Sequence, residues 1–165
     1  MNSVIENIYD DQFLLSVFKH KRKRGIVCLN WYLDDLARPD KVDFVLARLS
    51  EFHICEARII IQYWEEKKKL IRLFKRYNIE EYEIKREYKK NHVTPGYINI
   101  HVRNKSLPLD FLKVFLTRHY GNDFERPYSL SVTPYIIIDN GNDEIIAIKL
   151  YDDRGAYQYY IKKKH

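Results

Sequence analysis

The sequence predicts an α+β domain with a mixed or antiparallel sheet, about four helices and a C-terminal β-meander. Three observations lead to this fold class. Amphipathic segments with helical spacing alternate with short apolar runs over the first two thirds of the chain. From residue 135 onward, three apolar runs are separated by two turn sequences. The chain has 165 residues, 45% of them hydrophobic, which is enough for a core without metal or disulfide support.

No repeat, low-complexity tract or Gly/Ser-rich linker interrupts the chain. Its length is also that of one ordinary domain. We therefore expect residues 1–165 to form a single domain.

The first half of the chain is expected to alternate helices with strands. Apolar residues recur at helical spacing in the helices and form short continuous runs in the strands. Gly25 ends the first helix, and the fixed φ of Pro39 suits the start of the second, whose apolar stripe continues to Phe52. The predicted elements are a helix at 10–21, a strand at 26–31, a helix from 39 to about 52, a strand at 57–64 and a helix at 65–77.

The predicted helix at 65–77 separates its residues into two faces. The apolar face consists of Leu70, Leu73, Phe74 and Tyr77. The basic face consists of Lys68, Arg72, Lys75 and Arg76. This pattern is typical of a helix that packs one side on a core and turns the other to solvent.

The second half is expected to be richer in strands. Pro95-Gly96 marks a turn, and Asn140-Gly141 between apolar runs is a strong hairpin signal. The predicted elements are strands at 82–88 and 97–103, a helix at 108–120, and strands at 135–138, 144–151 and 156–162. In the strand at 97–103, period-two alternation places Tyr97, Asn99, His101 and Arg103 on one polar face, which we expect to contact water.

The net charge of +6 comes largely from one short segment. Lys19 and residues 21–24 supply five positive charges, which leaves 24 basic against 23 acidic residues elsewhere, a net of +1. With the basic helix face, this segment defines a candidate nucleic-acid site. Its residues are Lys21, Arg22, Lys23, Arg24, Lys68, Arg72, Lys75 and Arg76. The same charges also suit a solvated surface or an acidic protein partner.

Motifs for common chemistry are missing from the sequence. It contains neither a phosphate-binding P-loop nor a serine nucleophile elbow. The spacings of potential metal ligands are poor: His53 and Cys55 would lie on one face of an extended segment, but no second pair matches them. We expect Cys28 and Cys55 to be buried free thiols. We therefore predict no catalytic residue, no metal and no cofactor. A ribonuclease using His101 or His119 ranks last, since His119 falls on an apolar helix stripe.

The turn Tyr151-Asp152-Asp153-Arg154-Gly155 suits a hairpin with a type I turn and a glycine of positive φ. Residues 107–161, which include this run, resemble an uncharacterised bacterial family, a domain of unknown function whose C-terminal hairpin bears the same Tyr-Asp-Asp-Arg-Gly sequence. The resemblance implies a soluble bacterial protein without an established activity, and it transfers no catalytic residue. In size and character such proteins are similar to the immunity proteins encoded beside bacterial toxins.

The leading hypothesis is therefore a non-enzymatic immunity protein that covers the active site or the partner-binding surface of a cognate toxin. The 14 tyrosines and two tryptophans favour it, because these side chains are frequent contact anchors. The predicted partner-binding residues are Asp152, Asp153, Arg154, Tyr157, Tyr159 and Tyr160. We expect a heterodimer with the toxin, in the cytoplasm because no secretory signal is visible, and neither a membrane nor a small-molecule substrate as partner. Nucleic-acid binding is the alternative.

Overall fold

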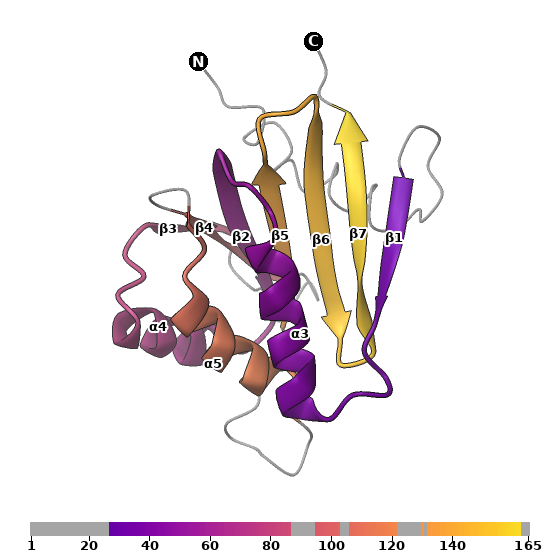
Figure 1. Ribbon diagram of the computed structural model, residues 1–165. Helices are drawn as coiled ribbons and strands as arrows, with labels where there is room; N and C mark the ends of the chain where they lie inside the picture. The colour runs from indigo at the N-terminus through magenta and orange to yellow at the C-terminus, as the bar shows by residue number, and fades with distance from the viewer. Residues whose placement is uncertain (1–26, 87–94, 103–105, 122–129, 131, 163–165) are drawn as a thin grey trace.

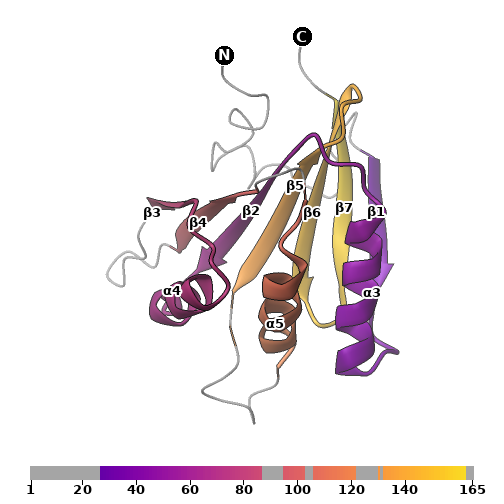
Figure 2. The ribbon, with the colours of Figure 1, turned by 60° about the vertical axis from the view of Figure 1, so that its left-hand side comes forward.

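The computed structural model describes residues 27–86, 95–102, 106–121, 130 and 132–162. They form a seven-stranded sheet in the order β1-β7-β6-β5-β2-β4-β3, and three helices that lie on one face of it (Figures 1 and 2). In chain order, the elements are β1 (Val27–Tyr32), α3 (Arg38–Ser50), β2 (Glu56–Tyr63), α4 (Lys67–Arg76), β3 (Tyr82–Arg86), β4 (Gly96–His101), α5 (Leu109–His119), β5 (Thr133–Asp139), β6 (Glu144–Asp152) and β7 (Gly155–Lys162).

The predicted fold class is wrong in its balance of helix and strand. The described residues contain three helices rather than about four, and every strand pair is antiparallel. The predicted helix at 10–21 lies outside the described residues. Helix α3 carries the chain from β1 to β2, and β7, β6 and β5 lie between these two strands. The strands that α3 connects, β1 and β2, are therefore not neighbours in the sheet, because the later strands β5, β6 and β7 lie between them.

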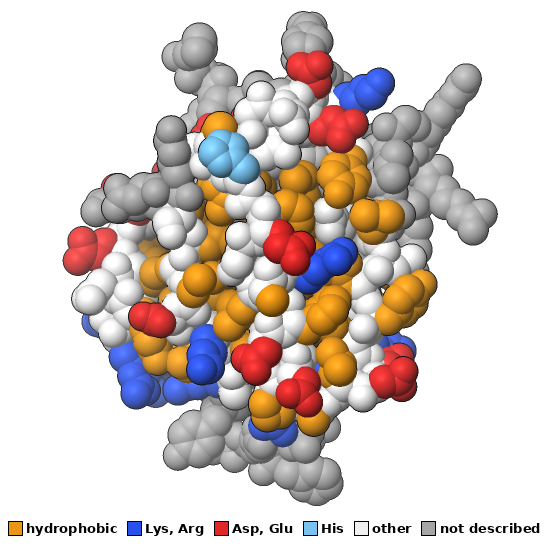
Figure 3. Space-filling model, in the orientation of Figure 1, with side chains coloured by type: hydrophobic (Ala, Val, Ile, Leu, Met, Phe, Trp, Pro, Cys, Tyr) orange, Lys and Arg blue, Asp and Glu red, His pale blue; other side chains and the backbone are white. Residues whose placement is uncertain are grey.

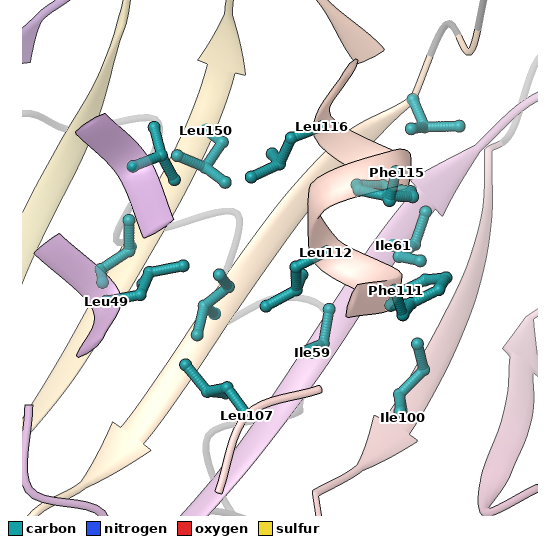
Figure 4. Close-up of a cluster of buried hydrophobic side chains, with 14 of the residues drawn as sticks. Leu49, Ile59, Ile61, Ile100, Leu107, Phe111, Leu112, Phe115, Leu116 and Leu150 are labelled. Carbon is teal, nitrogen blue, oxygen red and sulfur yellow. The ribbon is translucent and has the colours of Figure 1, made fainter. Parts of the chain in front are cut away.

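The main core lies between the sheet and the helices. Ile59 and Ile61 of β2 are completely buried and lie against α5, which contributes Phe111 and Phe115 (Figure 4). Period-two alternation along β2 places every second side chain on this face. Burial of these large apolar side chains supplies most of the stabilisation of the two layers, at about 25 cal/mol per Å² of apolar surface removed from water.

The face of the sheet opposite the helices is also buried. Tyr97 and Asn99 of β4 are 4% and 1% exposed, and Ile137 and Ala147 are not exposed at all. The expectation that Tyr97 and Asn99 contact water is therefore wrong, while Arg103 lies outside the described residues. Alternation predicted the face of each side chain correctly, but it does not predict what covers that face.

The predicted burial of Cys55 is wrong. Cys55 is exposed, because it lies in the loop before β2 and not within the sheet. The side chain of Cys28 lies outside the described part of the structure.

None of the three described helices has the length and apolar character needed to cross a membrane.

Candidate partner-binding site

The β6–β7 hairpin ends in a tip with fixed side-chain geometry. Asp152 pairs with Gly155, and Asp153 and Arg154 form the turn between them. The backbone N–H of Arg154 donates to Oδ1 of Asp152 at 2.7 Å, while its Nε and Nη2 donate to Oδ2 at 3.0 and 2.8 Å. One carboxylate therefore orders both the turn and the guanidinium, although the Arg154 side chain remains 67% exposed.

The two charged groups of this tip stabilise each other's ionised forms. Burial tends to raise the pKa of Asp152, but the hydrogen bonds and positive charge of Arg154 outweigh it and lower that pKa. The same contact raises the pKa of Arg154. Both groups are therefore charged at neutral pH, and the tip presents an oriented ion pair to solvent.

The tip is also attached to the segment between β1 and α3. The backbone N–H of Leu33 donates to the carbonyl oxygen of Arg154 at 2.9 Å. Lys41 of α3 donates from Nζ to the carbonyl oxygen of Asp153 at 2.7 Å and lies 3.8 Å from its carboxylate. The loop after β1 and helix α3, both distant from the hairpin in sequence, therefore hold its tip in place.

Gly155 is required at the tip for a reason other than the predicted one. Its φ is not positive; the described glycine with positive φ is Gly141, at 88°. Instead, a Cβ on Gly155 would overlap the carbonyl oxygen of Trp31 and approach the hydroxyl of Tyr151. The glycine allows β1 and β7 to come together where they meet the tip.

Aromatic side chains flank the charged tip. The rings of Tyr151 and Tyr157 stack with centroids 4.6 Å apart, and Tyr32, opposite Gly155 in the β1–β7 register, is 79% exposed. Burial and the neighbouring Tyr157 raise the pKa of Tyr151. We call this region the hairpin-tip surface; it consists of Tyr32, Tyr151, Asp152, Asp153, Arg154 and Tyr157.

The predicted partner-binding residues do not all lie together. Asp152, Asp153, Arg154 and Tyr157 belong to the hairpin-tip surface. Tyr159 is completely buried, and Tyr160 lies on the helix-covered face, where its hydroxyl accepts a hydrogen bond from Gln158. Sequence reasoning did not include Tyr32 and Tyr151. For Tyr151 its place beside the turn was a usable signal, whereas the position of Tyr32 depends on long-range strand pairing.

The alternative, basic site lies elsewhere. Lys68, Arg72, Lys75 and Arg76 are all exposed on α4, which lies beside β3 and β4, away from the β6–β7 turn (Figure 1). Figure 3 shows Lys and Arg side chains gathered at the lower left, where Figure 1 places α4. Lys21, Arg22, Lys23 and Arg24 lie outside the described residues. The hairpin tip and α4 are therefore two separate surfaces.

The two histidines of the ribonuclease hypothesis do not meet. His119 ends α5 on the helix side of the sheet, and burial lowers its pKa to about 4. His101 lies on the other face, with Nε2 at 3.2 Å from Arg58 and 3.7 Å from Glu83. Since the sheet separates them, they do not form an acid and base pair around one substrate.

Two other places in the described structure bear on binding chemistry. Sγ of Cys55 lies 3.8 Å from Nε2 of His53, but no cluster of three or more potential metal ligands occurs among the described residues. A cavity of about 490 Å³ lies between α3 and α5. It is lined by Arg38, Pro39, Val42, Asp43, Lys113 and Thr117. The groups of this lining that could act as a base or nucleophile, Asp43, Lys113 and Thr117, are all exposed to solvent.

No family model, curated protein or solved structure matches this chain.

Proposed function

We propose that this protein is a non-enzymatic immunity protein that binds a cognate toxin through the hairpin-tip surface and covers the toxin's active site or partner-binding surface. The observation that carries the proposal is the combination of a 79% exposed tyrosine, Tyr32, with an ordered ion pair, Asp152 and Arg154. Exposed tyrosine and arginine are among the side chains that contribute most to protein interfaces.

Order at the tip favours tight binding. Association loses affinity when mobile side chains and loops must be fixed in the complex. Here the contacts of Leu33 and Lys41 hold the backbone of the tip, and Asp152 holds the guanidinium of Arg154. A partner therefore meets a surface that is already arranged for contact.

The charge near the tip favours a basic surface on the partner. Asp34 and Asp35, in the loop after β1, are exposed, and the Asp153 side chain is 59% exposed. Asp34 is close enough to act electrostatically on Arg154. The net charge of +6 thus does not describe this surface, and local carboxylates would steer association with a basic toxin.

The test is neutralisation of the product of the neighbouring gene in the genome. We expect this product to be toxic when it is expressed alone. When the two are expressed together in the cytoplasm, the present chain should neutralise the product and co-purify with it. The double variant Tyr32→Ala/Asp153→Lys should weaken binding by at least about 30-fold, the effect of losing one interface hot spot.

The matched control is Leu109→Ala/Glu80→Lys, which truncates a 42% exposed apolar side chain and reverses an exposed acid on other surfaces. It should neutralise as well as the unmodified protein. A non-toxic neighbour, a neighbour that does not bind, or equal loss in both double variants contradicts the proposal.

A further inference from the structure

Helix α4 carries an unusual concentration of positive charge. Six of its ten residues, in the sequence KKKLIRLFKR, are Lys or Arg, and none is acidic. Leu70, Leu73 and Phe74 are buried in the core and fix the orientation of the helix. The remaining surface is therefore held toward solvent as a rigid basic stripe.

Four cations on the exposed side of α4 have no carboxylate partner among the described residues. We call them the α4 stripe: Lys68, Arg72, Lys75 and Arg76. Glu66 pairs at 3.3 Å with Lys69, which lies outside the stripe, and Arg76 stacks over Tyr77 at 5.8 Å. No ion pair with a described carboxylate therefore offsets the charges of Lys68, Arg72, Lys75 and Arg76.

The charges in the first turn of α4 do not favour helix stability, whereas Lys75 and Arg76 in its last turn do. Lys67, Lys68 and Lys69 occupy the first turn, which contains no acidic residue. The positive end of the helix dipole lies there and disfavours cations. Anion binding is a reason for the three lysines of the first turn, which the helix dipole does not favour.

We propose that the α4 stripe binds the sugar-phosphate backbone of single-stranded nucleic acid. Residues four apart on a helix differ by about 6 Å along its axis, so Lys68, Arg72 and Arg76 form a row of three cations over about 12 Å. Such a row tracks successive phosphates of an extended strand. The site is separate from the hairpin-tip surface and goes beyond the proposed function.

Trp64 favours a single strand over a duplex. Its side chain is 40% exposed, three residues before α4 begins. Aromatic side chains beside a basic groove bind unpaired bases by stacking, and a base inside a duplex offers no free face. In the proposed complex the stripe holds the phosphates and Trp64 stacks on a base.

The buried side of α4 argues against a membrane as the partner. A surface-binding amphipathic helix inserts its apolar face among the lipid chains. In this protein the apolar face is occupied, because Leu70, Leu73 and Phe74 are at most 2% exposed within the core. Only the charged side of the helix is available.

The test measures fluorescence anisotropy of labelled 20-nucleotide oligo(U) and oligo(dT) with the full chain at several salt concentrations. Four phosphate contacts predict a slope of about −2.8 for the logarithm of the binding constant against that of salt, or about 50-fold weaker binding at 200 than at 50 mM. Arg72→Gln/Lys75→Gln should reduce the magnitude of the slope by about 1.4. Binding of either oligonucleotide supports the proposal.

The matched control is Lys113→Gln/Lys162→Gln, which removes two exposed charges elsewhere and should leave the slope unchanged. Since Trp31 is 2% exposed, iodide quenching of tryptophan fluorescence reports mainly on Trp64, and oligo(U) should protect it. The proposal is overturned by absent oligonucleotide binding, by equal loss in both variants, or by binding confined to duplex DNA or to phosphatidylserine vesicles.

Discussion

The indole Nε1 of Trp31 donates a hydrogen bond to Oε1 of Gln158 at 2.8 Å, between β1 and β7 on the helix-covered face of the sheet. Both side chains are 2% exposed. The amide nitrogen of Gln158 in turn donates to the hydroxyl of Tyr160 at 2.8 Å. A buried polar chain thus ties the edge strand β1 to the C-terminal strand.

Replacing the amide by an apolar side chain of similar size, Gln158→Met, should destabilise the fold. It leaves the indole N–H of Trp31 buried without an acceptor, which costs about 1–3 kcal/mol. Urea unfolding measures the loss. Tyr160→Phe removes only a half-buried acceptor and should cost less than Gln158→Met; equal stability of Gln158→Met and the unmodified protein would contradict this account.

Gly155→Ala should be more disruptive than its size suggests. The added methyl group would overlap the Trp31 carbonyl oxygen, which is backbone and cannot rotate away. Forced separation of β1 and β7 should cost about 1–3 kcal/mol, as overpacking does in cores. Thermal unfolding measures it, with Ala156→Gly as the cavity-forming comparison at the next, fully buried position. An unchanged midpoint for Gly155→Ala would show that the strands have room to separate.

The buried imidazole of His119 predicts a loss of stability in mild acid. Its pKa of about 4 lies below the ordinary value of 6.5, so the unfolded chain binds a proton between these values that the folded protein does not. The stabilisation that neutral His119 contributes to the fold is therefore fully present above pH 6.5. It is lost as the pH falls to 4, which lowers the free energy of unfolding by about 3 kcal/mol in all.

The measurement is urea unfolding of the unmodified protein and of His119→Phe between pH 7 and pH 4. Phe suits the site because the imidazole already stacks on Phe115, with centroids 6.3 Å apart. The difference between the two proteins isolates His119 from the carboxylates, which titrate at lower pH. Parallel pH profiles would show that His119 is not the group responsible.

The sequence predicted elements whose signal is local. The apolar stripe of α4 indicated a helix, and the run of isoleucines in β2 indicated a strand. Both elements begin and end within about two residues of the predicted ranges. The pairing of Val27 with Tyr160 has no such signal, because strand partners far apart in the chain are chosen by the packing of the whole sheet. The exposed position of Tyr32 beside the hairpin tip follows from that pairing and was therefore not predicted.

Burial was harder to predict than strand position. Asn99 alternates with apolar neighbours as expected, but its amide is 1% exposed and has no hydrogen-bond partner within the described part of the chain. A polar residue on an alternating strand normally indicates a solvated face. The prediction for Cys55 was wrong in the opposite sense. An apolar run surrounds Cys55 in the sequence, which indicated burial, but the residue lies in an exposed loop in the structure.

The first turn of α4 offers a test in which stability and binding change in opposite directions. Lys68→Glu places a carboxylate near the positive end of the helix dipole and should stabilise the protein by a few tenths to about 1 kcal/mol at low salt. The same change removes one cation of the α4 stripe and adds a repelling charge, so oligo(U) binding should weaken. Thermal unfolding and anisotropy on one preparation measure both effects. Lys162→Glu is an equal charge change at the end of β7 and should leave oligo(U) binding unaltered. Because residue 162 lies opposite Glu144, this variant should lower stability slightly and not raise it. Higher stability with unweakened binding would confirm the dipole argument and contradict the role of the stripe, because a structural defect cannot account for that combination.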